Sequence, residues 1–211
     1  MPVFRKDGRS VLFIHVPKAG GSSIERVFGD AGYTVHYRDP RLGKGSLNRL
    51  RRCSPQHMHA SILQEVFRID LFDVVFMVTR HPLTRFRSEY GYARRHEDVA
   101  TDSEAVEQWA EKAFSAYAKD PFHLDNHLRP QSDFYLPGCT VYRLEDGMER
   151  VMTDLGRRLG TDFGGEVPRV LERKKESGVS SSEFTVSGQL QRRVEAFYSE
   201  DYDRFGYQRG A

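Results

Sequence analysis

Short, continuously apolar segments alternate along the chain with segments whose apolar residues recur at helical spacing. The strongest apolar runs are residues 11–16 (VLFIHV) and residues 72–79 (FDVVFMVT), both rich in β-branched and aromatic residues. Runs of this length and composition predict strands buried on both faces of a sheet. A glycine-containing turn follows the first run, and then Ile24, Val27 and Phe28 recur at helical spacing. The first unit is therefore predicted as strand, turn and helix.

The rest of the chain continues this alternation. Helices are predicted over residues 60–67, 83–95, 103–117, 148–159 and 188–202, and further strands over residues 33–37 and 139–143. Residues 38–56 are basic without periodicity and residues 160–187 are rich in Gly, Ser and Lys, so both are predicted as loops. Strands that alternate with helices favour an α/β fold, a single domain over residues 1–211 with a central parallel sheet flanked by helices.

Composition narrows the classes of function. The 211 residues are 38% hydrophobic and 12% aromatic with a net charge of +2, values that exclude a disordered chain and, on bulk charge, a polybasic nucleic-acid binder. The two cysteines, Cys53 and Cys139, lack metal-site spacing and cannot form a disulfide framework. No apolar run reaches the roughly 18 residues of a membrane span, and the run at residues 11–16 is too short for a signal peptide. We therefore expect a cytoplasmic protein.

The turn after the first strand, HVPKAGGSS at residues 15–23, combines several features of an anion site. Ligands of open parallel sheets bind beyond the carboxyl ends of the strands. Gly20 and Gly21 let the backbone approach a ligand closely, and the N-terminus of the next helix favours a phosphate or sulfate. Lys18 adds a charge, and Ser22 and Ser23 add hydroxyl donors. The alternative is an ordinary turn, because Gly-Gly-Ser-Ser also caps helices well.

This turn differs from the Walker A loop of nucleotide kinases and ATPases. In that motif the lysine follows the glycines, whereas Lys18 precedes them. The order weakens a kinase hypothesis.

A second candidate anion site follows the other strong strand, in TRHPLTRFRSEY at residues 79–90. Arg80 leaves the strand tip, and Arg85, Ser88 and Tyr92 share one face of the predicted helix. A planar guanidinium beside a hydroxyl suits a phosphate, although a capping arginine with polar surface neighbours has the same pattern. Two such sites at neighbouring strand ends predict a ligand with two anionic groups.

These motifs resemble those of the sulfotransferases that use 3′-phosphoadenosine 5′-phosphosulfate (PAPS). HVPKAGGSS resembles their 5′-phosphosulfate loop and TRHPLTRFRSEY their 3′-phosphate motif, with His81 where the family commonly has Asp. VYRLED at residues 141–146 and FYSEDYDRFGY at residues 197–207 are also similar. The resemblance is greatest to the carbohydrate branch, Golgi-type and bacterial, which includes 2-O-sulfotransferases. It implies the P-loop NTPase-like sulfotransferase fold and sulfuryl transfer to a hydroxyl, with a carbohydrate as the expected acceptor.

The resemblance also implies roles for individual residues. The 5′-phosphosulfate would be held by Lys18, Ala19, Gly20, Gly21, Ser22 and Ser23, and the 3′-phosphate by Arg80 and Ser88. A segment resembling the H-x-H of 2-O-sulfotransferases is present at residues 57–59, and its second histidine, His59, maps to their proposed base. His57 is the alternative base, and a metal pair or a structural cap is the non-catalytic interpretation. The expected reaction is an in-line displacement in which Lys18 stabilises the leaving phosphate and no metal is required.

Two other polar segments each allow a functional and a structural interpretation. Residues 125–131 (DNHLRPQ) suit a substrate loop or a solvated loop, and the basic residues from Arg38 to Arg52 attract an anionic glycan or are simply solvated. Arg173–Lys175, near Ser180–Ser182, are candidates for covering the 3′-phosphate, and His15 is expected to be a core histidine. A non-catalytic nucleotide-binding module remains the main alternative function. A small metabolite or a lipid remains open as acceptor.

Overall fold

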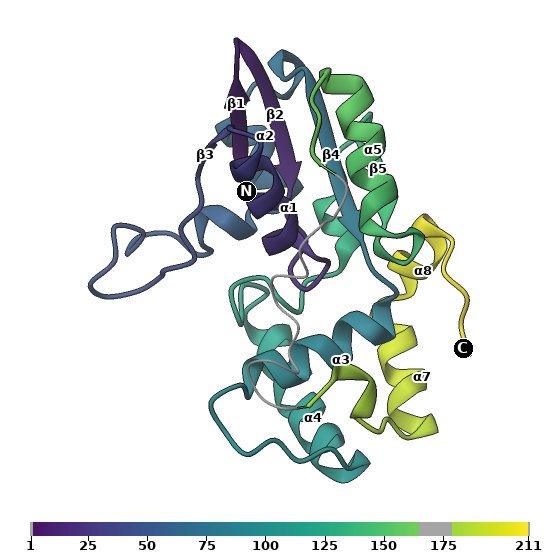
Figure 1. Ribbon diagram of the computed structural model, residues 1–211. Coiled ribbons are helices and arrows are strands. Elements are labelled where there is room, and N and C mark those ends of the chain that lie inside the picture. The colour runs from purple at the N-terminus through teal and green to yellow at the C-terminus, as the bar shows by residue number, and fades with distance from the viewer. Residues whose placement is uncertain (1, 165–178, 211) are drawn as a thin grey trace.

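Five strands form one sheet in the order β3-β1-β2-β4-β5 (Figure 1). The computed structural model describes residues 2–164 and 179–210. The strands are β1 (Val3–Lys6), β2 (Arg9–Ile14), β3 (Thr34–His36), β4 (Val74–Thr79) and β5 (Thr140–Arg143). Strands β2, β4 and β5 are parallel, whereas β1 runs antiparallel to both β2 and β3. The predicted α/β class with a parallel centre is confirmed, and the antiparallel β1, with β3 beyond it, extends that centre into a mixed sheet.

The antiparallel strand β1 is the element that sequence patterning missed. It forms a hairpin with β2 in which Lys6 pairs with Arg9, so only Asp7 and Gly8 make the turn. Both turn residues have positive φ, 49° and 80°, as the tight turns that match strand twist require. Asp-Gly supplies that conformation, but the apolar run before it is only Val3 and Phe4, too short to show a strand period.

The helices lie close to their predicted positions. They are α1 (Gly21–Asp30), α2 (Ala60–Val66), α3 (Pro82–Ala93), α4 (Ser103–Lys119), α5 (Met148–Leu159), α7 (Gly188–Phe197) and α8 (Ser199–Phe205). The helix predicted over residues 188–202 is two helices, because the chain leaves helical geometry at Tyr198 (φ −104°, ψ 25°). Tyr198 is fully buried there, and its hydroxyl donates to the Leu128 carbonyl at 2.9 Å. This tertiary contact accompanies the break.

Two apolar clusters cover the two faces of the sheet. Helices α1 and α5 cover one face, where the rings of Phe4, Phe13, Phe28 and Phe76 stack at centroid distances from 4.0 to 6.3 Å. Residues of α2, α3, α4, α7 and α8 form the cluster with the other face. Figure 1 shows α3, α4 and α7 gathered beyond the ends of β2 and β4. In the described part of the chain, no helix combines the length and the apolar character that crossing a bilayer requires.

The parallel register determines where the two predicted anion motifs meet. Ile14 pairs with Met77 and Thr79 pairs with Arg143, so β2, β4 and β5 end at the same edge of the sheet. The chain leaves these three ends through residues 15–20, Arg80 and Leu144. Both predicted anion motifs therefore lie at this edge.

Candidate active site

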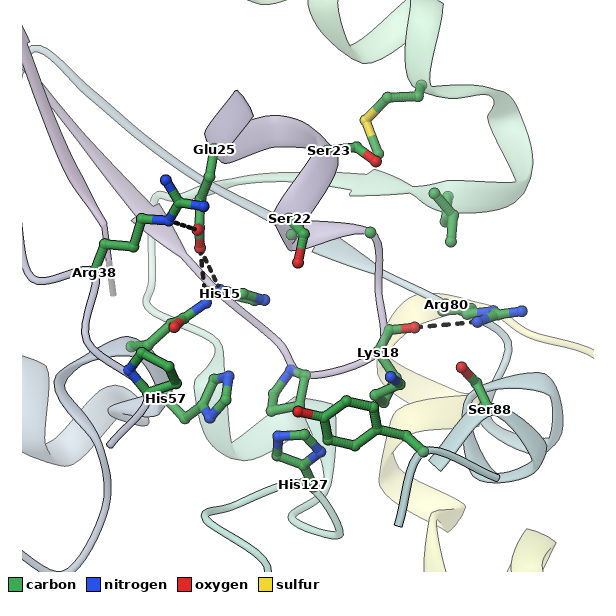
Figure 2. A pocket seen from close by; sticks show the side chains of 18 of the residues that line it. His15, Lys18, Ser22, Ser23, Glu25, Arg38, His57, Arg80, Ser88 and His127 are labelled. Atoms are coloured by element: carbon green, nitrogen blue, oxygen red, sulfur yellow. Dashed lines mark hydrogen bonds and ion pairs between the residues drawn. The ribbon is translucent and has the colours of Figure 1, made fainter. Parts of the chain in front are cut away.

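A cavity of about 950 Å³ opens at the carboxyl edge of the sheet. The predicted donor-site residues that line it are Lys18, Gly20, Gly21, Ser22, Ser23, Arg80 and Ser88. Ala19 is not among the lining residues, because its side chain is 1% exposed in the core. Figure 2 shows Lys18, Arg80 and Ser88 on one side of the cavity and Ser22 at the start of α1. The fold brings the two motifs, about sixty residues apart in the chain, to one space.

The loop between β2 and α1 has the backbone that its glycines predict. Lys18 and Gly20 both have positive φ, 65° and 86°, and Gly20 is the N-cap of α1. At Gly21 an added Cβ would lie 2.0 Å from Nε2 of His15, so only glycine fits between this turn and the buried ring. The first turn of α1 contains no acidic residue to compete for an anion. Its N-terminus therefore presents backbone N–H groups and a positive dipole end beside Ser22 and Ser23.

Lys18 and Arg80 are held next to each other. Nη1 of Arg80 donates to the Lys18 carbonyl at 3.2 Å, and Nζ of Lys18 lies 3.7 Å from the centroid of the Tyr92 ring. The Gln131 amide pairs with the backbone of Arg80, accepting from its N–H at 2.9 Å and donating to its carbonyl at 2.8 Å. Burial lowers the pKa of Arg80, yet a guanidinium stays charged at neutral pH. Two cations are thus positioned on one wall of the cavity.

His81 replaces the aspartate that is common in the resembling motif, and the structure supplies a carboxylate from elsewhere. The backbone N–H of His81, the N-cap of α3, donates to Oε1 of Glu145 at 2.7 Å. The other oxygen of Glu145 accepts from the Tyr207 hydroxyl at 3.2 Å, and both tyrosines 202 and 207 pack edge-on against the His81 ring. Glu145 belongs to VYRLED and both tyrosines belong to FYSEDYDRFGY, so three of the resembling motifs meet at the start of α3.

Three histidines line the cavity, and each pairs through Nδ1 with its own carboxylate. His15 pairs with Glu25 at 3.0 Å, His57 with Asp125 at 2.7 Å and His127 with Glu89 at 2.6 Å. The His57 ring lies edge-on between the rings of His15 and His127, with centroids 5.1 and 4.8 Å away. Figure 2 shows His57 and His127 below the loop that carries Lys18.

The His57–Asp125 pair has a defined protonation state. Burial lowers the pKa of His57 to about 3, against the opposing effect of its hydrogen bond to Asp125. Burial alone would raise the pKa of Asp125, but the hydrogen bond from His57 lowers it overall. At neutral pH a neutral imidazole therefore donates from Nδ1 to a carboxylate, which leaves Nε2 as a proton acceptor.

His59 faces a different environment, two residues along. Its ring packs edge-on against Phe122 and Phe134 at centroid distances of 5.5 and 6.4 Å, and its Nδ1 lies 3.4 Å from Nδ2 of Asn126. Burial, aided by the charge of Arg129, lowers the pKa of His59 to about 4. His59 is not among the residues that line the cavity, whereas His57 is. Its predicted role as base stays a prediction.

Residues 126–129 and Gln131 are buried and Asp125 and Pro130 are half-buried, so residues 125–131 are not a solvated loop. Leu124, Asp125 and Asn126 have positive φ values of 54°, 54° and 65°, a run of three non-glycine residues in a conformation that is costly for each. The fully buried Arg85 holds the residues after this run in place, since its Nη1 and Nη2 donate to the carbonyls of His127 and Arg129 at 2.9 and 2.7 Å. Arg85 therefore supports the cavity wall and does not line the cavity itself.

Two residues of this segment and His57 form the group of described residues best placed to hold a metal ion. His57, Asp125 and His127 offer ligand atoms within 4.8 Å of one another. The Nδ1 atoms of both histidines are already hydrogen-bonded to carboxylates. Asp125 therefore accepts a hydrogen bond from His57, and hydrogen bonding explains why these three side chains lie close together.

The sequence patterns singled out Arg38 and Tyr92 but missed His15 and Glu25 as residues that line the cavity. His15 is buried as expected but also lines the cavity, together with Glu25, Arg38 and Tyr92. Glu25 was detectable, because it is a lone carboxylate on the apolar face of α1. Burial alone would raise its pKa, but His15 and Arg38 lower it overall, so Glu25 is an anion paired with Arg38 at 3.0 Å.

The segment predicted to cover the 3′-phosphate, Arg173–Lys175 near Ser180–Ser182, lies only partly within the described residues. Arg173–Lys175 lie outside the described residues. Ser180 caps a short 3₁₀ turn over residues 181–183, and this turn does not line the cavity.

The chain is similar to a known protein family over nearly its whole length. The family model described as "Sulfotransferase family" matches residues 1–208. No curated protein and no solved structure gave a significant match. The matched region includes all five strands, both anion motifs and the cavity between them. Since the match extends over nearly the whole chain, the protein belongs to the sulfotransferase family.

Proposed function

We propose that this protein transfers a sulfuryl group from PAPS to a hydroxyl of a carbohydrate acceptor. Family membership supports sulfuryl transfer in general. The observation that carries the more specific proposal is the shared cavity, in which the start of α1 and Lys18 lie together with Arg80 and Ser88. PAPS has anionic groups at both its 5′ and 3′ positions, and a cavity of about 950 Å³ is large enough for a nucleotide and part of an acceptor.

The two ends of the donor would be bound by different chemistry. The start of α1, with Ser22 and Ser23, suits the 5′-phosphosulfate because it offers N–H groups and hydroxyls, and Lys18 in the preceding loop adds an ammonium to the same cavity. Arg80 and Ser88 suit the 3′-phosphate, because a guanidinium and a hydroxyl offer directional hydrogen bonds to its oxygens. Ala19 contributes backbone only, since its side chain is buried.

His57 is the better placed of the two candidate bases. It lines the cavity and its Nε2 is the acceptor nitrogen, whereas His59 packs among aromatic rings away from the lining. Asp125 holds Nδ1 of His57 in its protonated form, so the ring need not change tautomer before it accepts a proton. Anions bound nearby raise the pKa of an imidazole, so the donor itself would strengthen His57 as a base.

The reaction then follows from these positions. His57 takes the proton from the acceptor hydroxyl as the oxygen forms its bond to sulfur. On the opposite side of the sulfur, the bond to the bridging phosphate oxygen breaks, and Lys18 balances the negative charge that develops on that oxygen. The products are a sulfate ester and adenosine 3′,5′-bisphosphate, with the proton left on His57. The protein's contribution is positioning and electrostatics, as in phosphoryl transfer.

Ligand selectivity separates this function from its alternatives. Adenosine 3′,5′-bisphosphate at about 100 times its Kd should raise the melting temperature by roughly 5–10 °C, with ATP and Mg²⁺ clearly weaker. Arg80→Met should remove most of this shift. Arg26→Met is the matched control, because Arg26 is 57% exposed on α1 and does not line the cavity. A preference for ATP with Mg²⁺ would favour a nucleotide kinase and overturn the proposal.

Turnover with labelled PAPS tests catalysis and the identity of the base. His57→Ala should lower kcat at least about 100-fold while leaving affinity for the bisphosphate intact, and His59→Ala should change kcat only a few-fold. The reverse result would make His59 the base. An array of glycan, small-metabolite and lipid acceptors identifies the acceptor, and selective bisphosphate binding without turnover on any of them would support the non-catalytic binding module.

A further inference from the structure

A loop beside the cavity combines exposed cations with exposed leucines. We define it as residues 41–52, RLGKGSLNRLRR, which contain five basic residues and no acidic residue. All five basic side chains are exposed. Leu47 and Leu50 are 95% and 93% exposed, so nearly the whole of each side chain is in contact with water. Figure 1 shows this segment projecting from the sheet, between β3 and α2.

Internal hydrogen bonds give the loop a defined shape. Nδ2 of the buried Asn48 donates to Oδ2 of Asp39 at 3.2 Å and to the Arg41 carbonyl at 3.0 Å. These hydrogen bonds connect the second half of the loop to its beginning. At the other end Arg52 pairs with Asp120 at 3.2 Å. Asn48 therefore turns inward while its neighbours Leu47 and Arg49 face solvent. The leucines are held outward by the fold of the loop.

Two of the large apolar side chains that are exposed in the described residues belong to this loop. The full set is Tyr37, Leu47, Leu50, Val66 and Leu71. Scattered surface leucines need no explanation, but two almost fully exposed leucines among cations indicate an interaction surface.

We propose that residues 41–52 dock the protein on an anionic lipid bilayer. The basic side chains match the negative potential of such a surface, although Arg41 and Arg52 also pair with Asp39 and Asp120. The two exposed leucines match the apolar layer beneath the headgroups. A polyanionic glycan would satisfy the cations but leave Leu47 and Leu50 in water. A second copy of the loop would cover the leucines but bring like charges together. A bilayer with anionic headgroups satisfies both sets of side chains.

The position of the loop links docking to the cavity. Arg38 and Pro40, just before the loop, line the cavity, and Arg38 pairs with the buried Glu25. A bilayer bound at residues 41–52 would therefore lie near one wall of the cavity. The docking itself does not depend on the proposed reaction, so the two can fail separately.

Vesicle co-sedimentation tests the docking with the full chain. We expect the protein to sediment with vesicles that contain phosphatidylglycerol and not with pure phosphatidylcholine vesicles. Lys44→Ala with Arg49→Ala should weaken binding roughly 30-fold, and Leu47→Ser with Leu50→Ser at least roughly tenfold. Leu47→Met with Leu50→Met should retain binding, because apolar area is kept. Arg192→Ala with Arg193→Ala, on exposed positions of α7, is the matched charge control and should also bind like the wild type.

Three results would overturn the proposal. The first is no binding to anionic vesicles by a wild-type protein whose melting is cooperative. The second is binding to soluble heparin, lost on removing the cations but unchanged in the leucine-to-serine variant, which would assign the loop to a polyanionic glycan. The third is a wild-type dimer in light scattering that becomes a monomer in the leucine-to-serine variant, which would assign the surface to a second copy. All variants keep Asn48 and its hydrogen bonds within the loop, and a matched melting temperature shows that the overall fold is retained.

Discussion

Gly21→Ala tests whether the anion loop is packed against His15. An added Cβ would lie 2.0 Å from Nε2 of His15 and 2.4 Å from both adjacent ring carbons. Comfortable contacts begin at roughly 3.5 Å, so the loop or the ring must move by more than about 1 Å. The ring is 5% exposed, bonded to Glu25 at 3.0 Å and stacked on Phe13 at 5.3 Å, so it has little room to move.

Overpacking of this kind costs about 1–3 kcal/mol of the free energy of unfolding. For a chain of this size, the melting temperature should fall by roughly 2–12 °C. The displaced loop should also weaken binding of adenosine 3′,5′-bisphosphate. Urea denaturation followed by circular dichroism measures the first effect, and calorimetric titration measures the second.

Gly29→Ala is the matched control on the same helix. A Cβ at Gly29 meets nothing within 4 Å, so the substitution should stabilise the protein by about 0.5–1 kcal/mol through helix propensity, with binding unchanged. If Gly21→Ala unfolds at the wild-type urea concentration and binds the bisphosphate equally well, the close packing of the loop on His15 is refuted.

The remaining predictions concern the cavity wall. Lys18→Met should lower turnover about 100-fold or more without changing the urea midpoint. Asp125→Asn should lower kcat more than it raises KM, because the His57 tautomer is no longer held. Since the pKa of His57 is about 3, its base form persists far below pH 6.5, and kcat/KM should not fall as the pH drops below 6.5. The bound donor raises this pKa, so kcat, measured with saturating donor, should begin to fall at a higher pH than kcat/KM. A fall of both quantities at the same pH, near 6.5, would contradict this. Gln131→Ala should weaken bisphosphate binding roughly tenfold in titration, because two hydrogen bonds that hold the Arg80 backbone are lost.

Sequence patterns predicted the elements whose signals are local and long. The helix over residues 148–159 has its predicted bounds, and the strands that precede both anion motifs are present. Local patterns failed where the signal was short or was overridden. Strand β1 has two apolar residues before its turn, and the predicted C-terminal helix breaks at Tyr198, where a buried contact to Leu128 forms.

By itself the sequence determined that two segments with cations and hydroxyls follow buried parallel strands, because apolar runs, glycines and cations act over a few neighbouring residues. Only the tertiary structure decided which histidine faces the cavity. His57 and His59 are two residues apart, and Met58 between them is fully buried. Their orientations depend on Asp125 and Asn126, almost seventy residues further along the chain, which contact His57 and His59 respectively. Such long-range contacts leave no periodic trace in a sequence, because they depend on how separate elements pack and not on the residues beside them.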